Sequence, residues 1–123
     1  MKKGWHKSKV IAGHGLAKTL GYPTINLDNP EILKGRKKGV YLCRIIIKEK
    51  LYYGLLYFGP RLILKEEKNI IEVYIIDFHE EIYAQMIEFK LVKYIRGVMD
   101  FAKMEDLKEQ IEKDFLEAAN LIK

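Results

Sequence analysis

An antiparallel β-barrel followed by one C-terminal helix is the fold that this sequence predicts, and two patterns indicate it. The first three quarters of the chain hold short runs of β-branched and aromatic residues, separated by tight turns with no helical pattern between them. The last twenty residues change to a helical period. A chain of 123 residues has the size of one domain, so we expect a single domain over 1–123, with the barrel at about 5–96 and the helix at about 103–122.

Four strands follow from the composition of the runs, at 39–48, 51–58, 69–78 and 82–95. Only Glu49 and Lys50 separate the first run from the second, so these two are expected to form an antiparallel hairpin. In the fourth run, Ile82, Ala84 and Met86 form one alternating apolar set, and a bulge is expected further along.

The C-terminal segment is predicted to be an amphipathic helix of about five turns. Its start lacks a good cap, with Ala102 and Lys103 where Ser or Asp would be expected, so we expect the helix to depend on packing against the barrel. The apolar stripe consists of Met104, Leu107, Ile111, Phe115, Ala118 and Ile122.

The composition limits the class of protein and its partners. A net charge of +5 suits an anionic partner, but nucleic acid and nucleotide phosphates satisfy it equally well. No apolar run approaches the roughly 20 residues that a membrane-spanning helix requires, and no apolar stretch follows the basic N-terminus, so we expect a cytoplasmic protein without membrane partners. Cys43 is the sole cysteine and lies in an apolar run, which predicts a buried hydrophobic residue.

A glycine-rich segment lies at 12–22. Gly13 and Gly15 allow the backbone to approach a ligand with its amides free for phosphate oxygens, and Lys18 adds a positive charge. The Gly-Lys-Ser/Thr ending of a P-loop is absent, so that type of nucleotide site is excluded. Ordinary turn glycines remain the alternative.

The next segment begins with Pro23, which fixes the backbone as the chain leaves the glycine-rich loop. Thr24 and Asn26 are two residues apart on an extended segment and therefore face the same side. A hydroxyl and a carboxamide together can hold a hard cation and phosphate oxygens. Both side chains could equally bond local backbone groups, which is a common use of Thr and Asn.

Two charged residues interrupt the apolar strands. Glu72 stands among apolar neighbours, where it is either a general base in a cleft or a carboxylate on the barrel exterior paired with Lys or Arg. Asp77 has the same two interpretations. Arg96 follows the last strand, where it could clamp phosphate or lie in solvent.

Taken in order, these pieces resemble the riboflavin kinase (flavokinase) family, and the resemblance spans nearly the whole chain. The matching pieces are Gly13-His14-Gly15, Leu20-Gly21-Tyr22-Pro23-Thr24-Ile25-Asn26, Gly39-Val40-Tyr41, Ile71-Glu72-Val73-Tyr74-Ile75-Ile76-Asp77-Phe78, Tyr83, Ile95-Arg96 with Phe101, and Leu107…Gln110-Ile111…Asp114.

The resemblance implies a six-stranded antiparallel barrel of Greek-key type with a C-terminal helix. It also implies a kinase that uses ATP and Mg²⁺ to convert riboflavin into FMN, releasing ADP. The phosphates and metal would meet Thr24 and Asn26 beside the loop of Gly13, Gly15, Lys18 and Pro23. Glu72 would accept the proton of the ribityl 5′-hydroxyl. The flavin ring would lie toward Arg96, Met99 and Phe101.

The chain departs from the family pattern at four places. Leu16-Ala17-Lys18 keeps one positive charge where the family has two arginines, Leu62 and Ile63 replace a second Pro-Thr, Tyr57 stands for Asn, and Ala84 for Gly. An active kinase is the preferred interpretation. The alternatives are a weakened flavin- or nucleotide-binding relative with a regulatory role, and a basic nucleic-acid-binding barrel, which would leave Thr24, Asn26 and Glu72 unexplained.

The partners expected on this basis are riboflavin and ATP rather than nucleic acid, and a monomer is expected. The chain is too short to include the adenylyltransferase half of bacterial FAD synthetases, so FAD synthesis is not expected of it.

Overall fold

The structure is a computed structural model and describes residues 3–12 and 24–122. Six strands, two short 3₁₀ helices and one α-helix make up this part of the chain. Their bounds are β1 Trp5–Ile11, β2 Ile25–Leu27, η1 Pro30–Leu33, β3 Gly39–Ile47, β4 Lys50–Pro60, η2 Leu62–Leu64, β5 Asn69–Ile75, β6 Met86–Gly97 and α2 Met104–Ile122.

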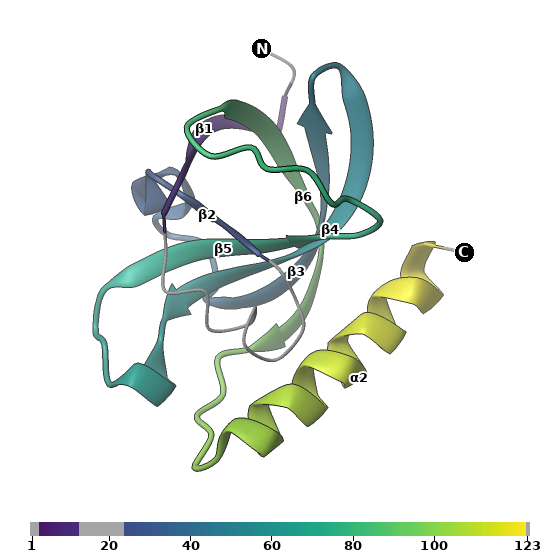
Figure 1. Ribbon diagram of the computed structural model, residues 1–123. Coiled ribbons are helices and arrows are strands. Elements are labelled where there is room, and N and C mark those ends of the chain that lie inside the picture. Colours follow the sequence, from purple (N-terminus) through teal and green to yellow (C-terminus); the bar gives the residue numbers. More distant parts are fainter. Residues whose placement is uncertain (1–2, 13–23, 123) are drawn as a thin grey trace.

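The six strands close into a barrel in the order β1-β2-β5-β4-β3-β6 (Figure 1). Every neighbouring pair is antiparallel, including β1 with β6, which closes the ring. Among the described residues, each strand therefore has a paired neighbour on both sides. The mainly β architecture with one C-terminal helix confirms the predicted fold class.

Alternate side chains of the strands fill the barrel interior. On β3, for example, Tyr41, Cys43, Ile45 and Ile47 belong to the internal cluster, and Phe89 of β6 is fully buried there. Cys43 is therefore the buried residue that its apolar surroundings predicted.

Helix α2 lies along the outside of the barrel (Figure 1). Side chains that point outward from β3 and β4, such as Val40, Leu42 and Leu55, form a second cluster with Ala118 and Phe115 of the helix. This face explains why the C-terminal stripe is apolar, since burial of that stripe is what stabilises the helix. None of the helices in the described part of the chain is long and apolar enough to span a membrane.

The hairpin between β3 and β4 turns one residue earlier than the sequence suggested. Ile47 pairs with Lys50, so Lys48 and Glu49 are the two loop residues. Both have positive φ, at 49° and 70°, which is the conformation of a two-residue turn that matches the twist of the flanking strands.

The predicted fourth strand begins too early. Residues 82–85 form a turn in which the amide of Gln85 donates to the carbonyl of Ile82, and Ala84 has a φ of +67°. Strand β6 starts only at Met86, which is 57% exposed, whereas Ile87 and Phe89 point inward. The predicted alternating set of Ile82, Ala84 and Met86 does not continue from the turn into β6, so that prediction was wrong. Strand β5 ends at Ile75, so Asp77 lies in a turn, exposed and at positive φ.

The expected bulge is present, as two register shifts between β3 and β6. They lie between Val40 and Tyr41 and between Leu42 and Cys43. Bulges re-aim the side chains that follow. Tyr94 consequently packs against the internal cluster, while Arg96, the partner of Val40, lies on the outer side beneath α2.

Candidate functional site

A cleft separates the outer barrel face from α2 and from the connection that leads into it; we call it the helix cleft. Most of its lining is apolar and comes from β4, β5, η2 and α2, with a few polar groups converging on it. Such a mixture is typical of a small-molecule site. The polar lining residues are Thr24, Tyr57, Arg61, Glu72, Arg96 and Asp114, and Met99 and Phe101 lie on the side of the β6–α2 connection.

Strand register aligns three polar side chains across the outer barrel face. Glu72 of β5 is the Cα partner of Asn26 on β2 and of Tyr57 on β4. Their neighbours Leu27, Ile71 and Val73 fill the interior, so by alternation Asn26 and Glu72 both face outward. The amide of Asn26 and the carboxylate of Glu72, 46 residues apart in sequence, are thus brought together by the pairing of β2 with β5.

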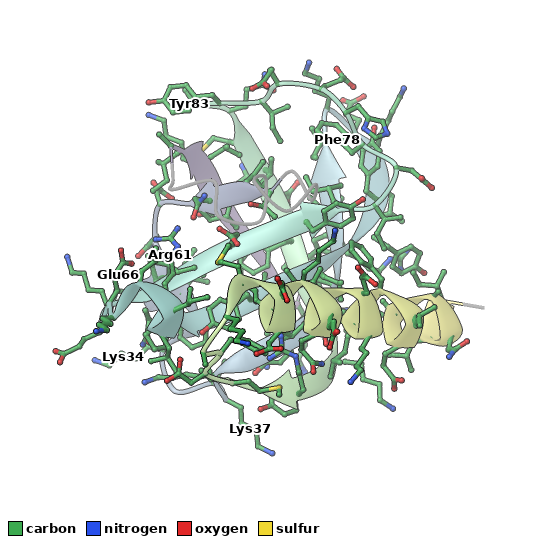
Figure 2. The ribbon with its side chains drawn as sticks, turned by 60° about the horizontal axis from the view of Figure 1, so that its bottom comes forward. Lys34, Lys37, Arg61, Glu66, Phe78 and Tyr83 are labelled. Atoms are coloured by element: carbon green, nitrogen blue, oxygen red, sulfur yellow. The ribbon has the colours of Figure 1, made fainter. Side chains whose placement is uncertain are left out.

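Arg61 connects this row of side chains. Its Nη2 donates to Oδ1 of Asn26 at 2.6 Å and lies 3.8 Å from Oε2 of Glu72. Its Nη1 donates to Oε1 of Glu66 at 3.3 Å. Figure 2 shows Arg61 and Glu66 beside η2, near the N-terminal end of α2. The Arg61 side chain is only 9% exposed, so these contacts lie in surroundings where charge interactions are weakly screened.

Glu72 combines the two interpretations that the sequence left open. It lies on the barrel exterior and is paired with an arginine, yet it also lines the helix cleft and its side chain is only 16% exposed. A nearby guanidinium favours the ionised carboxylate, which is the form that can accept a proton.

Tyr57 of β4 is the third polar side chain of this row. Its hydroxyl donates to the carbonyl of Pro60, the residue that directly precedes Arg61. Burial raises the pKa of Tyr57 to about 12; Arg96 opposes the rise, Glu72 adds to it and Arg61 opposes it. Tyr57 therefore remains a neutral hydroxyl at physiological pH.

Arg96 holds α2 against the barrel. Its Nε and Nη2 donate to Oδ1 and Oδ2 of Asp114 at 2.9 Å each, and its Nη1 donates to the carbonyl of Gly97 at 3.0 Å. Gln110 donates to the same carboxylate. Arg96 is thus neither a free phosphate clamp nor a solvated residue, and its guanidinium forms part of the cleft wall.

A second hollow is also lined by Thr24, and Phe78 and Tyr83 contribute to its lining. Thr24 lines both hollows, and Asn26 lines the second one. Oγ1 of Thr24 is buried and has no hydrogen-bond partner among the described residues. A buried hydroxyl without a partner is costly, which makes this oxygen a candidate donor to a ligand or ion.

The chemistry of these donors limits the kind of metal ion. Within residues 3–12 and 24–122, no group of three or more His, Cys, Asp and Glu side chains could hold a metal. The hydroxyl of Thr24 and the amide oxygen of Asn26 are hard oxygen donors, and the amide oxygen has a second lone pair besides the one that Arg61 uses. Such a sparse set fits a magnesium ion that takes its other ligands from water and phosphate.

The structure places some of the predicted site residues and not others. Thr24, Asn26 and Glu72 come together, and Arg96, Met99 and Phe101 line the same cleft. Gly13, Gly15, Lys18 and Pro23 lie outside the described residues. The sequence interpretation assigned no role to Arg61, Tyr57 or Asp114. For Arg61 the signal was the run Gly59-Pro60-Arg61 at the end of an apolar strand, which is similar to a Gly-x-Arg of the family pattern but gave no contact.

Comparison with protein families gives one clear match. The family model described as flavokinase, or riboflavin kinase, matches residues 4–122.

Curated relatives with similar sequences include the following two. The bifunctional riboflavin kinase/FMN adenylyltransferase of Listeria monocytogenes is 35% identical over 109 residues, which cover 88% of this chain and 35% of that protein. The RNA-binding riboflavin kinase RibR of Bacillus subtilis is 33% identical over 107 residues, which cover 85% of this chain and 45% of that protein. The chain therefore spans less than half the length of either relative.

The barrel also resembles a solved structure. A chain described as a macrolide-efflux protein from Streptococcus pneumoniae matches with a TM-score of 0.78 and 27% identity, covering 94% of this chain and 38% of that one. Because one fold can serve different activities, this likeness supports the architecture and not a particular reaction.

Proposed function

Because the chain belongs to the riboflavin kinase family, we propose that it transfers the γ-phosphoryl group of ATP to the 5′-hydroxyl of riboflavin, giving FMN and ADP. One observation carries the proposal. Glu72 lines an apolar cleft and pairs in register with Asn26, and Thr24 is shared between this cleft and a second hollow. Two substrates in the two hollows would meet at these three side chains.

The helix cleft suits the flavin. Its apolar lining from β4, β5 and α2 complements a flat aromatic ring, with Met99 and Phe101 on one side and the plane of the Arg96 guanidinium on another. Burial of the ring here would point the ribityl chain toward Glu72, because that carboxylate lies at the polar end of the cleft.

The second hollow suits the nucleotide. The phosphates would lie near Thr24 and Asn26 and near the backbone amides of Gly13 and Gly15, with Lys18 and Pro23 in the same segment. The orphaned hydroxyl of Thr24 and the second lone pair of the Asn26 amide oxygen would hold Mg²⁺, which neutralises phosphate charge when bound.

The residues of the chain contribute positioning and one proton transfer. The oxygen of the riboflavin 5′-hydroxyl forms a bond to the γ-phosphorus, the bond from that phosphorus to the β,γ-bridging oxygen breaks, and ADP leaves. Glu72 accepts the proton that the hydroxyl releases, and the apolar walls keep water from competing for the phosphoryl group. Riboflavin and ATP are the proposed partners of a cytoplasmic monomer, without nucleic acid; the RNA binding named for RibR belongs to that protein.

Incubation of the purified chain with riboflavin, ATP and magnesium tests the proposal, with FMN measured by chromatography. We expect FMN to appear in proportion to enzyme, with one ADP for each FMN. Absence of FMN above a blank without enzyme would overturn the kinase proposal, and flavin and nucleotide titrations would then show whether the chain only binds them.

A further inference from the structure

Arg61 has an unusual set of contacts for a residue outside the predicted site. Its side chain is nine-tenths buried, between β4 and η2, and contacts Asn26, Glu66 and Glu72 at once. Its Nε is buried and has no hydrogen-bond partner within the described part of the chain. A buried guanidinium whose Nε–H has no partner among these residues can still donate to a further acceptor, of the kind that a phosphate supplies.

The contact with Asn26 decides how that amide is oriented. The two ends of a carboxamide differ chemically, since only the oxygen can ligate a cation. Because Arg61 is purely a donor, it requires the oxygen of Asn26 to face it, at 2.6 Å. The same nitrogen, Nη2, lies 3.8 Å from Glu72. One guanidinium thus fixes the relative placement of the amide and the carboxylate.

We propose that Arg61 is a positioning residue that also keeps the metal site closed to a free divalent cation until a nucleotide arrives. This inference rests on the proposed function for its catalytic consequence, although its effect on cation binding can be measured without any reaction.

The selection against a free cation depends on the charges around the site. Glu66 and Glu72 give the site two negative charges, and Arg61 cancels one of them while occupying one lone pair of the Asn26 oxygen. A free cation held by Asn26 would therefore lie beside a buried positive charge, which disfavours its binding. When a nucleotide is present, binding of the metal becomes favourable, because the phosphates attract the metal and the guanidinium alike. Arg61 then selects the metal–nucleotide complex over the metal alone.

Titration with Mn²⁺ in the absence of nucleotide, followed by the loss of the free-ion EPR signal, tests this selection. We expect Arg61→Ala to bind Mn²⁺ about tenfold more tightly than the wild type, because it loses a positive charge at the site. Arg61→Lys keeps the charge and should stay within about threefold of the wild type. The same variants should bind Mg·ADP more weakly, about tenfold for Arg61→Ala. Thermal unfolding establishes that each variant is folded.

The distinctive result is tighter Mn²⁺ binding together with weaker Mg·ADP binding by Arg61→Ala. A residue that only supports the fold would weaken both kinds of binding when removed. Weaker or unchanged Mn²⁺ binding by folded Arg61→Ala would overturn the proposal. If Arg61→Ala proves unfolded, Arg61→Gln, which is shorter than arginine but polar and uncharged, takes its place with the same expected signs.

Turnover separates this inference from the proposed function. If the wild type forms FMN, kcat of Arg61→Ala should fall about 10- to 100-fold, as expected when a supporting partner of a metal ligand is lost. Free guanidinium at tens of millimolar should restore part of kcat, whereas urea at the same concentration should not. Lack of rescue together with unchanged Mn²⁺ binding would refute the role of Arg61. If the wild type forms no FMN, the proposed function fails and the Mn²⁺ titration still decides on Arg61.

Discussion

Removal of the Asp114 carboxylate should loosen α2 from the barrel. Asp114 accepts two parallel hydrogen bonds from Arg96 and one from Gln110, and its side chain is 5% exposed. In Asp114→Ala, Arg96 keeps only its bond to the carbonyl of Gly97. Loss of one partner from a buried ion pair costs about 3–5 kcal/mol. Because 16% of the Arg96 side chain can still reach water, we expect a loss of about 2–4 kcal/mol in the free energy of unfolding.

Urea denaturation measures this loss. For a chain of this length the entropy of unfolding is roughly 0.26 kcal/mol per kelvin, so a loss of about 3 kcal/mol should lower Tm by roughly 10 °C. Glu112→Ala, an exposed carboxylate on the same helix, is the matched control and should change stability by less than about 0.5 kcal/mol. The double variant Arg96→Met with Asp114→Leu should recover most of the loss, because apolar residues can replace a buried pair. A loss under about 1 kcal/mol in Asp114→Ala would refute the anchoring role.

Three further predictions concern the barrel. Gly39→Ala should cost more than about 3 kcal/mol, since a Cβ there would lie 2.0 Å from the carbonyl oxygen of Arg96. Gly35→Ala has open space around it and bears only the strain of a φ of +88°, so it should cost about 1–2 kcal/mol; urea denaturation compares them, and equal losses would contradict the packing argument. Glu49→Gly should stabilise the chain by up to about 1 kcal/mol by relieving a positive φ in the hairpin, and a lower Tm would contradict it. Burial raises the pKa of Tyr57 to about 12 from its ordinary 10, so the unfolded chain releases this proton first and stability falls as pH rises across that window. Between pH 10 and pH 12, the free energy of unfolding of the wild type should fall by about 1 kcal/mol more than that of Tyr57→Phe. Equal decreases in the two proteins would show that the pKa of Tyr57 is not raised.

The sequence predicted the long strands and the helix well because their patterns have a physical cause that acts locally. Strands β3, β4 and β5 are rich in β-branched and aromatic residues, and the helical stripe has one buried face. Strand β1 was missed because its exposed positions are Lys7, Lys9 and the apolar Ile11, and only Ser8 and Val10 are buried, so polar and apolar residues do not alternate. Strand β2 has three residues, too few to show a period. In both cases pairing with distant strands, rather than local preference, makes the segment a strand.

The site was predicted in part for the same reason. Thr24, Asn26 and Glu72 were recognisable by their chemical type, but their proximity depends on the pairing of β2 with β5. The role of Arg61 was missed because its partners Asn26 and Glu72 lie on other strands, and only the pairing of the strands brings them together. The partnership of Arg96 with Asp114 was missed because it depends on the bulges that turn Arg96 outward.

The central claim is that Glu72 accepts the proton of the riboflavin hydroxyl at the meeting point of the two hollows. Paired measurements on Glu72→Gln test it most directly: the rate of FMN formation and the affinity for Mg·ADP. We expect the rate to fall by at least about 100-fold, because the amide cannot accept the proton. The affinity should stay within about threefold of the wild type, because the side chains proposed to hold the metal and phosphates remain. A near-normal rate in this variant would contradict the account.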